Sequence, residues 1–526
     1  MKKILKELLL GIEIKKIYGS DDIKVTGIYD DSRKIKKGGV FIAIKGDHVD
    51  GHDFIHKAID KGATVIVGEI EPDGHWLKNS VYVKVKNTRE VLGPIAASWY
   101  GNPARKLHVI GVTGTDGKTT TSTMICHILK NSGKKVGLLT TVAAKIGGEE
   151  IDTGLHVTNP ESIELQRYLS EMVKKNLNYV VLEVTSHGLD QGRVYGVDFE
   201  TAVLTNITHE HLDYHKTKQK YFEAKLKLFK MVKNFAVINN DCPYSKKIID
   251  RLSKDVDVIT YAIQNNAQVT GSEYKKIGKY YTFKVSYKEN TSDVKLRIPG
   301  EFNMENALAA ISASFAYGVS LDECAKFLRS FSGVKGRMHE VKNKKGLKIY
   351  VDFAHTPNGI EQSLKFLKGS KRGRLISVFG CAGERDVEKR ILMPKTSVKL
   401  SEISIFTAED PRHEDVNDIL ATMEKAAVDE GATQYDEMFR CLDNGTGEKR
   451  NKKQRENKKR FYKLVTERGE AISYAINEVA QSGDTVAIFG KGHEKSMAYN
   501  GKEYQWSDFD AVKMALKGKV KVIKKR

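Results

Sequence analysis

Several features that mark particular classes of protein are scarce in this sequence. Its 526 residues include only five cysteines, which are scattered and form no metal-ligand pairs, as is usual in a reducing compartment. No apolar run approaches the roughly 18 residues that span a membrane, and no small-residue cleavage site follows the lysine-containing start. These absences predict a cytoplasmic protein that does not insert into a membrane.

Acidic residues are fewer than basic ones. The chain has 87 Lys and Arg against 67 Asp and Glu, a formal net charge of +20. Such a charge permits contact with nucleic acid, but it equally suits a lysine-rich proteome and anionic small substrates. Because no recognition motif for RNA or DNA accompanies the charge, we expect no nucleic-acid partner.

The positive charge is most concentrated in residues 447–460. Eight of these fourteen residues are Lys or Arg, two are acidic and none is apolar. This composition favours a solvated, mobile insertion, which we place at residues 445–462.

The length of the chain is too great for one hydrophobic core and predicts roughly three domains. Short apolar runs typical of strands alternate with helical stretches, which is the pattern of an α/β fold. We expect domains at residues 1–104, 105–334 and 335–526. The expected strands are residues 40–44, 63–67, 81–85, 107–110, 179–182, 202–205, 347–351, 375–379, 403–406 and 485–489.

The most informative motif, residues 111–121, lies between an expected strand and an expected helix. Its glycines let backbone N–H groups face an anion, Lys118 can reach the outer phosphates, and the Thr119 hydroxyl suits Mg²⁺. The general phosphate-loop pattern has glycine at the position of Val112, whereas here that glycine comes later. The motif predicts a nucleoside triphosphate bound by a shortened loop beside a parallel sheet. The expected loop residues are Gly114, Thr115, Asp116, Gly117, Lys118, Thr119 and Thr120.

Polar residues follow two further expected strands. Glu183 stands at the end of one strand, where ligands collect in an open α/β sheet, so its carboxylate could hold Mg²⁺ or equally could cap the next helix. Another strand leads into residues 208–215, which are rich in histidine. Zinc is one interpretation of this density, but the lack of cysteine and the phosphate loop favour magnesium and phosphate chemistry.

Motifs in order along nearly the whole chain resemble those of the Mur ligases of peptidoglycan synthesis, most closely the branch that adds the third, diamino residue. The resemblance implies an amino-terminal domain for the UDP-sugar, a central ATPase and a carboxy-terminal Rossmann-like domain that brings the amino acid. It also implies a role in cell-wall synthesis and therefore in cell shape and division. The matching segments are residues 31–33, 50–52, 114–120, 183–193, 211–215, 221–225, 302–306, 333–337, 352–357 and 490–494.

The reaction that the resemblance implies has two steps. ATP phosphorylates the D-glutamyl carboxylate of UDP-MurNAc-L-Ala-D-Glu to an acyl phosphate, and the amine of a diamino acid then displaces phosphate. We expect the enzyme to be a monomer. The residues carried over for the UDP-sugar are Asp31, Ser32, Thr158, Asn159, Thr185, Gln191 and Arg193. Asn159 stands where the family commonly has threonine, and both groups can hydrogen-bond.

The same resemblance assigns residues to ATP and magnesium. Lys118 and Arg337, together with Mg²⁺, would screen the attacking carboxylate from the triphosphate. Thr119 and Glu183 match ligands of one magnesium ion, and His211 matches a ligand of a second.

Three further residues are carried over near the nucleotide. Lys225 matches a lysine that the family carries as a CO₂-derived carbamate, which replaces a repelling ammonium by an oxygen anion that magnesium prefers. Asn306 matches an adenine contact and His355 a nucleotide-side residue. Without the resemblance, Lys225 would be taken for part of a solvated helix face and His355 for a turn residue beside Pro357.

The amino acid that is added depends on the segment Glu409-Asp410-Pro411-Arg412. In the family, Asp-Asn-Pro-Arg marks enzymes that use meso-diaminopimelate, whose distal carboxylate a guanidinium can grip with two hydrogen bonds. Asp410 in place of asparagine would repel that carboxylate and welcome an ammonium. Meso-diaminopimelate is favoured, and L-lysine stays an alternative. The matched contacts are Arg390, Asp410, Arg412, Gly490 and Glu494.

Two other functions fit part of the sequence. Folylpolyglutamate synthase shares this type of phosphate loop and the acyl-phosphate chemistry, but the separate amino-terminal unit with Asp31-Ser32-Arg33 counts against it. A regulatory or nucleic-acid-associated NTPase is suggested only by the loop and the charge.

Overall fold

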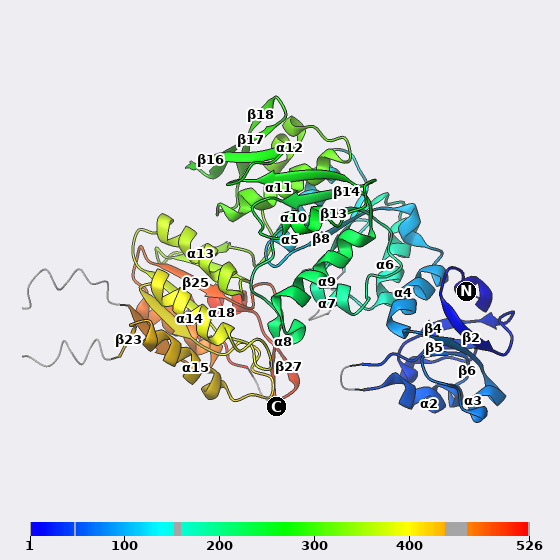
Figure 1. The fold of residues 1–526 in the computed structure, drawn as a ribbon. Helices are drawn as coiled ribbons and strands as arrows, with labels where there is room; N and C mark the ends of the chain where they lie inside the picture. The colour runs from blue at the N-terminus through cyan, green and yellow to red at the C-terminus, as the bar shows by residue number, and fades with distance from the viewer. Residues whose placement is uncertain (1, 47–48, 152–158, 437–459, 524–526) are drawn as a thin grey trace, which may run out of the picture.

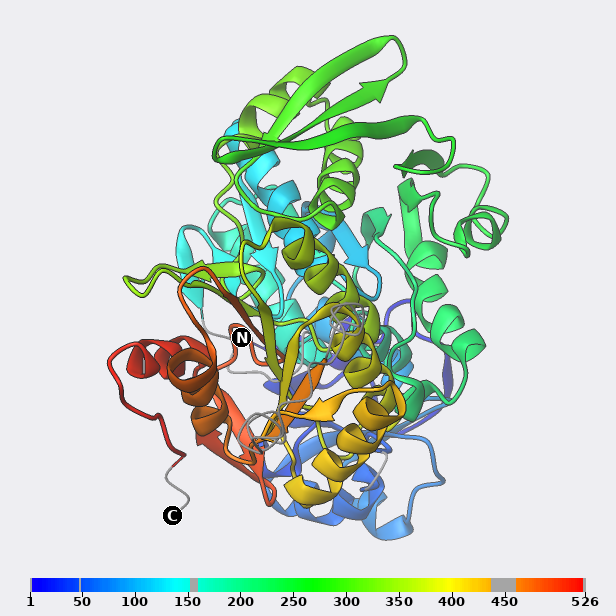
Figure 2. The same cartoon turned by 90° about the vertical axis from the view of Figure 1, so that its left-hand side faces the viewer.

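Three α/β domains follow one another along the chain. The computed structural model describes residues 2–46, 49–151, 159–436 and 460–523. In Figure 1 the amino-terminal domain (blue) and the carboxy-terminal domain (yellow to red) lie on opposite sides of the central domain. Figure 2 views the molecule from the side of the carboxy-terminal domain. The three main sheets have five, eleven and seven strands.

The amino-terminal domain has a five-stranded sheet with the order β2-β7-β6-β5-β4. Its side chains alternate between the two faces: Val65 and Val67 pack with α4, whereas Ile66 packs with α2 and α3. The elements are β2 (Ile14–Tyr18), β4 (Gly27–Tyr29), β5 (Gly39–Ile42), α2 (Ile55–Asp60), β6 (Ala63–Gly68), α3 (Gly74–Asn79), β7 (Val81–Val85) and α4 (Thr88–Trp99). A small ribbon of β1 (Lys3–Ile4) and β3 (Lys24–Val25) and the short helix α1 (Leu5–Leu8) precede or flank them.

The central sheet has the order β11-β10-β9-β12-β8-β13-β14-β15-β16-β17-β18, and pairing is parallel from β9 to β16. Its strands are β8 (His108–Thr113), β9 (Val136–Leu139), β10 (Ala144–Ile146), β11 (Glu149–Ile151), β12 (Tyr179–Glu183), β13 (Phe199–Leu204), β14 (Val232–Asn239), β15 (Asp257–Ala262), β16 (Val269–Ile277), β17 (Tyr280–Tyr287) and β18 (Asn290–Leu296).

Helices cover both faces of the central sheet, so its parallel strands are buried on both sides. Val109 and Val180 belong to the core beneath α6 and α9, whereas Ile110 and Val181 belong to the core beneath α5, α11 and α12. The helices are α5 (Lys118–Asn131), α6 (Ser162–Lys174), α7 (Ser186–Asp190), α8 (Leu212–His215), α9 (Lys218–Met231), α10 (Ser245–Ile249), α11 (Phe302–Phe315) and α12 (Leu321–Leu328).

The carboxy-terminal sheet has the order β19-β20-β25-β21-β22-β24-β23 and is parallel except for β19. Val378 packs towards α17 and α18, and its neighbour Phe379 packs towards α13, α14 and α15. The elements are β19 (His339–Val341), β20 (Lys348–Asp352), α13 (Pro357–Ser370), β21 (Leu375–Phe379), α14 (Lys389–Leu400), β22 (Ile403–Phe406), α15 (Val416–Asp429), β23 (Thr433–Gln434), β24 (Phe461–Leu464), α17 (Arg468–Tyr474), β25 (Thr485–Phe489), the ribbon β26 (Ser496–Tyr499) and β27 (Lys502–Gln505), and α18 (Asp508–Ala515).

The α/β class and every expected strand are confirmed, some with shifted ends. Strand β5 ends at Ile42 instead of Ile44, because the Ile44 carbonyl accepts from the Gly51 N–H and the chain turns there. The sequence analysis did not predict the antiparallel strands β16 to β18. Thr158 and most of the basic segment, residues 447–459, lie outside the described residues. In the described parts of the chain, no helix is long and apolar enough to cross a membrane.

Candidate active site

The phosphate loop connects β8 to α5, as the sequence predicted. Gly114 and Gly117 have φ angles of 153° and 84°, in the region that favours glycine. A Cβ on Gly114 would lie 1.8 Å from Thr205 Oγ1, and one on Gly117 would lie 2.2 Å from Asn306 Oδ1. Among the described residues no side chain caps α5. Its first N–H groups are therefore available to an anionic ligand.

Glu183 lies at the end of β12 and is buried against the loop. Its Oε2 accepts a hydrogen bond from Thr119 Oγ1 at 3.0 Å, and Arg337 Nη2 donates to the same hydroxyl at 3.0 Å. The alternative that Glu183 caps the next helix is wrong, because Thr185 is the N-cap of α7 and accepts from the Gly188 N–H. A hydroxyl, a carboxylate and a guanidinium thus meet at the first turn of α5.

Lys225 lies on α9 and is 1% exposed, so the solvated-face alternative is wrong. Its Nζ donates to the Gly114 carbonyl at 2.6 Å and lies 4.5 Å from the centre of the Tyr221 ring. Burial, with the nearby Lys118 charge, holds the pKa of Lys225 well below its usual value. A buried amine with a lowered pKa is partly neutral, and the neutral amine is the form that reacts with CO₂.

His211 immediately precedes α8 in a left-handed conformation, with φ of 55°. Burial, with the neighbouring His187, lowers the pKa of His211 well below its usual value. The imidazole is therefore neutral, which is the form that binds metals. Oxygen groups on Thr119 and Glu183 suit Mg²⁺, and a carbamate on Lys225 would add another, so these side chains fit the expected metal.

Two cavities meet at the phosphate loop. The first, here called the nucleotide cavity, includes Asn303, Asn306 and Asp241; the second, the reaction cavity, includes Lys118, Glu183 and His211. Asp116, Gly117 and Arg337 line both. The loop therefore lies between a chamber with several amide side chains and a chamber with more charged groups.

Asn306 and His355 line different cavities. Asn306 Nδ2 donates to Asn303 Oδ1 at 3.0 Å, and its Oδ1 accepts from Thr121 Oγ1 at 3.2 Å, so neighbours hold the amide beside the nucleotide cavity. His355 lines the reaction cavity, and its Nδ1 donates to the Phe353 carbonyl at 2.9 Å. His355 thus faces the phosphate side of the loop.

The carboxy-terminal domain also grips the phosphate loop directly. Asp116 Oδ1 accepts from Thr356 Oγ1 at 3.0 Å, and Asp116 Oδ2 accepts from Asn358 Nδ2 at 2.8 Å. Thr356 is at the same time the N-cap of α13, where its Oγ1 accepts from the Gly359 N–H. The start of α13 is therefore fixed to the loop that would hold the phosphates.

Four of the five residues matched to the amino acid line the same reaction cavity. Arg412, Gly490 and Glu494 come from two turns that follow strands of the carboxy-terminal sheet. Arg412 Nη1 donates to the Gly383 carbonyl at 3.2 Å. Arg390 is buried behind them and donates from Nη2 to Glu414 Oε1 at 2.8 Å. Of the matched set, Arg390 is already ion-paired away from the cavity.

Asp410 is held on both sides. Its Oδ1 accepts from the Ala498 N–H at 2.9 Å, and its Oδ2 accepts from Lys491 Nζ at 2.7 Å. The same ammonium lies 2.5 Å from Glu494 Oε2. Lys491 lies within the matching segment 490–494, but the resemblance assigned it no role.

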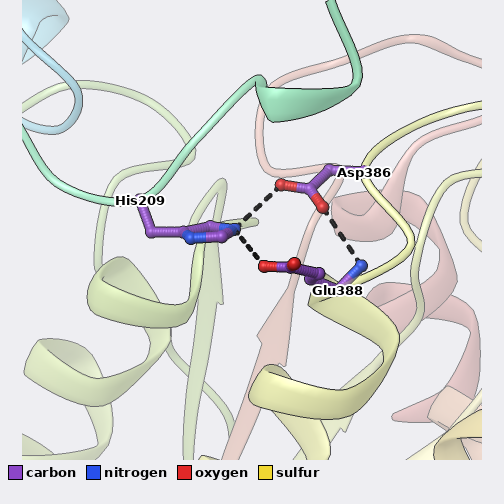
Figure 3. Close-up of side chains that lie close together, drawn as sticks. All are labelled: His209, Asp386 and Glu388. Carbon is purple, nitrogen blue, oxygen red and sulfur yellow. Dashed lines mark hydrogen bonds and ion pairs between the residues drawn. The ribbon is translucent and has the colours of Figure 1, made fainter. Parts of the chain in front are cut away.

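A second contact joins the central and carboxy-terminal domains. His209 Nε2 lies 3.0 Å from Asp386 Oδ2 and 3.4 Å from Glu388 Oε2, and the Glu388 N–H donates to Asp386. Figure 3 shows the three side chains pointing toward one another. The next residues along each segment also pair, since Lys389 Nζ donates to Glu210 Oε1 at 2.6 Å. His209, Asp386 and Glu388 lie close enough to share a metal ion. With Lys389 beside them, we describe them as a charged domain contact.

Two of the residues matched to the UDP-sugar lie where the amino-terminal and central domains meet. Gln191 and Arg193 line a cavity there with Asp30, Arg89 and Glu161. The last three of these were missed from the sequence, because no local pattern distinguishes them from surface charges.

Asn159 and Thr185 contact each other at the turn after β12, and Thr185 lines the reaction cavity. Asn159 Oδ1 accepts from the Thr185 N–H and hydroxyl, and its Nδ2 donates to the Glu183 carbonyl at 2.7 Å. Arg193 Nη1 donates to the Asn159 carbonyl at 2.9 Å. Asn159 is thus placed to shape the turn after β12 rather than to reach outward.

Asp31 and Ser32 lie at a turn of the amino-terminal domain. Asp31 caps the 3₁₀ turn Ser32–Lys34 and forms an ion pair with Arg33 at 2.9 Å. This pairing lowers the pKa of Asp31, mainly through the hydrogen bond from Arg33. The Asp31 carboxylate is therefore charged and ordered at neutral pH.

Comparison with protein families finds three matches in order along the chain. The profile for the Mur ligase family, catalytic domain, matches residues 24–100; that for the Mur ligase middle domain matches residues 112–314; and that for the Mur ligase, glutamate ligase domain, matches residues 336–492. Together the three profiles span most of the chain.

Individual proteins match over nearly their full length. UDP-N-acetylmuramoyl-L-alanyl-D-glutamate–2,6-diaminopimelate ligase 1 of Clostridium acetobutylicum is 36% identical, with 98% of this chain and 99% of the relative covered. The corresponding ligase of Alkaliphilus metalliredigens is 39% identical, with 93% of each chain covered. A solved structure of a ligase with this name superposes with a TM-score of 0.65 at 29% identity and covers 98% of this chain and 99% of its own.

A folylpolyglutamate synthase from Mycobacterium tuberculosis is a more distant match. It superposes with a TM-score of 0.59 at 16% identity and covers 76% of this chain and 91% of its own. That likeness shows a shared fold alone.

Proposed function

The chain belongs to the Mur ligase family, an ATP-dependent family of amide-forming enzymes, and from this premise we propose that it joins meso-diaminopimelate to UDP-MurNAc-L-Ala-D-Glu. The product would be a peptidoglycan precursor. The full-length relatives that carry this activity in their names support the proposal.

One observation carries the proposal most directly. The reaction cavity is lined on one side by Lys118 and Glu183 of the central domain and on the other by Arg412 and Glu494 of the carboxy-terminal domain. A phosphate-binding loop thus faces a site that offers the guanidinium of Arg412 and the carboxylate of Glu494. Such a pair matches the carboxylate and ammonium at the distal end of diaminopimelate.

In the first step, a carboxylate oxygen of the D-glutamyl group attacks the γ-phosphorus of ATP and ADP leaves. Two anions must approach each other for this attack. Lys118 and Arg337 supply positive charge at that point, and Arg337 remains charged although burial lowers its pKa. Their fixed positions favour the transition state in which charge spreads over the transferred phosphoryl group.

Metal ligands would complete this arrangement. We propose that Thr119 and Glu183 hold one Mg²⁺ and that His211 and a carbamate on Lys225 hold a second. Bound magnesium would neutralise the charge of the phosphates. The buried amine of Lys225 supports the carbamate, because among the described residues it bonds to a carbonyl and has no carboxylate partner.

In the second step, the amine of the amino acid attacks the acyl-phosphate carbon, the carbon–oxygen bond to phosphate breaks, and the nitrogen loses a proton. The protein must aim the amine at this carbon while holding the far end of the molecule. Arg412 would bind the distal carboxylate and Glu494 the distal ammonium. The start of α13, fixed to Asp116, keeps this half of the site close to the phosphates.

The UDP-sugar would bind at the opposite end of the molecule. Gln191 and Arg193, with the turn that Asn159 shapes, would contact it beside Asp31 and Ser32 of the amino-terminal domain. We further propose that the enzyme acts as a monomer in the cytoplasm. Light scattering on the purified full chain measures the monomer part of this proposal.

Release of ADP tests the function. We expect it to require UDP-MurNAc-L-Ala-D-Glu and meso-diaminopimelate together, with L-lysine a weak substitute. Equal or better use of L-lysine would overturn the choice of amino acid. Stimulation by a folate and glutamate, or by RNA or DNA, in place of the UDP-sugar would overturn the ligase assignment itself.

A further inference from the structure

Lys491 is a fully buried lysine in the amino-acid half of the reaction cavity. It follows β25 between Gly490 and Gly492, whose φ angles are 110° and 51°. Its Nζ lies 2.7 Å from Asp410 Oδ2 and 2.5 Å from Glu494 Oε2. A single ammonium thus joins two carboxylates that belong to different turns.

Several carboxylates surround this ammonium, so the site would carry excess negative charge without Lys491. Glu409, Asp410 and Glu494 all line the cavity, as do the cations Arg412, Arg385 and Lys389, of which Lys389 is paired with Glu210. The neighbouring cations are engaged elsewhere: Arg390 with Glu414, Arg468 with Asp508, and Arg385 near Asp213. Lys491 therefore supplies the balancing positive charge at this point.

Lys491 keeps its own charge despite its burial. Burial disfavours the ammonium, but the ion pairs with Glu494 and Asp410 outweigh that effect and raise the pKa of Lys491. A buried lysine that stays protonated makes a fixed positive charge. Both oxygens of Asp410 therefore have a partner in the protein, Oδ2 with Lys491 and Oδ1 with the Ala498 N–H.

The inference rests on the proposed addition of a diamino acid. We propose that Lys491 is a specificity-determining positioning residue, whose charge neutralises Asp410 so that an amino acid with a distal carboxylate is accepted beside Arg412. It acts through Asp410 and Glu494 and does not itself touch the reacting atoms. Asp410 and Glu494 both pair with Lys491, and Glu494 would in addition receive the distal ammonium.

This role predicts an effect that depends on the substrate. Replacing the ammonium with an apolar side chain of similar length, Lys491→Met, leaves Asp410 as an unpaired carboxylate beside the distal carboxylate. We expect the KM for meso-diaminopimelate to rise about 30-fold. L-Lysine has no distal carboxylate, so its use should fall less. The KM values for ATP and the UDP-sugar should not change.

Asp410→Asn provides the decisive comparison, because it removes the charge that Lys491 neutralises. In the double variant Asp410→Asn/Lys491→Met we expect the KM for meso-diaminopimelate to return to within about threefold of that of Asp410→Asn alone. Lys371→Met is the matched control, since Lys371 forms an ion pair with Glu402 in the same domain outside the cavity. It should leave all three KM values unchanged.

A merely structural bridge between the two turns would behave differently. Loss of such a bridge would raise the KM values for meso-diaminopimelate and L-lysine by the same factor. Adding Asp410→Asn would then not lower either value, because the bridge would still be missing. That result would overturn the proposal. If Lys491→Met does not fold, the proposal is tested by comparing Asp410→Asn with the double variant. A difference above about tenfold between their KM values for meso-diaminopimelate would overturn the proposal. Failure of the proposed function is separate, because it appears as absence of ADP release in the unaltered enzyme.

Discussion

Arg412→Ala tests which end of the amino acid the carboxy-terminal domain binds. The Arg412 guanidinium is half-buried in the reaction cavity, and its hydrogen bond within the protein is a 3.2 Å contact to the Gly383 carbonyl. Removing the side chain therefore disturbs little of the protein itself. It would strand the distal carboxylate of diaminopimelate beside Glu494.

The size of the effect follows from the burial of Arg412. Loss of a charged hydrogen-bond partner costs about 2–4 kcal/mol in a desolvated site. Solvent screens a half-buried group, so we expect about 2–3 kcal/mol, or roughly 30- to 150-fold in kcat/KM for meso-diaminopimelate. Use of L-lysine should be unchanged or improved, because lysine has no distal carboxylate.

Two further variants sharpen this measurement. Arg412→Lys keeps the charge but loses the planar pair of donors, so its kcat/KM should fall between those of the unaltered enzyme and Arg412→Ala. Arg372→Ala removes an exposed arginine of the same domain and should leave kcat/KM unchanged for both meso-diaminopimelate and L-lysine. Unaltered diaminopimelate kinetics in Arg412→Ala would refute the assignment of Arg412 and leave the ligase assignment standing.

Three other outcomes are expected. Lys118→Ala should lower kcat for ADP release about 100- to 1,000-fold, because no neighbouring group replaces its charge at the phosphates, and near-normal turnover would contradict the loop assignment. Lys225→Ala should be inactive and partly restored by a small carboxylic acid such as acetate; full activity without one would contradict the carbamate. Burial, with Asp410 and Glu494 nearby, raises the pKa of Glu409 from 4.5 to about 8. Its contribution to stability is therefore full below pH 4.5 and is lost as the pH rises through about 8, so Glu409→Gln should flatten the fall in Tm over that interval, and an unchanged slope would refute the shift.

Local sequence signals predicted the parts of the site that lie within one strand, turn or helix. The phosphate loop could be predicted because glycine, lysine and threonine must follow a buried strand in that order. Glu183 was found because it ends an apolar run. In both cases the chemistry and the backbone geometry are set by neighbouring residues, which a single sequence displays.

Contacts between domains left no such signal. Asp116 and Asn358 are 242 positions apart, and Glu210 and Lys389 are 179 positions apart. Their pairing depends on how whole domains dock, and no pattern within a single segment of the sequence specifies that docking. The role of Lys491 was missed for a related reason: a lysine between two glycines resembles an exposed turn, and only the fold reveals two carboxylates around it.

The grip of α13 on Asp116 has a consequence for the order in which products leave. Asp116 lines both cavities and bonds to Thr356 and Asn358 of the domain that carries the amino-acid site. Docking of this domain and binding of the nucleotide are coupled, and such coupling is reciprocal. The free energy by which docking strengthens nucleotide binding is therefore equal to the free energy by which bound nucleotide strengthens docking. Departure of ADP should therefore loosen the domain, and the lengthened peptide should be released more readily after ADP than before it.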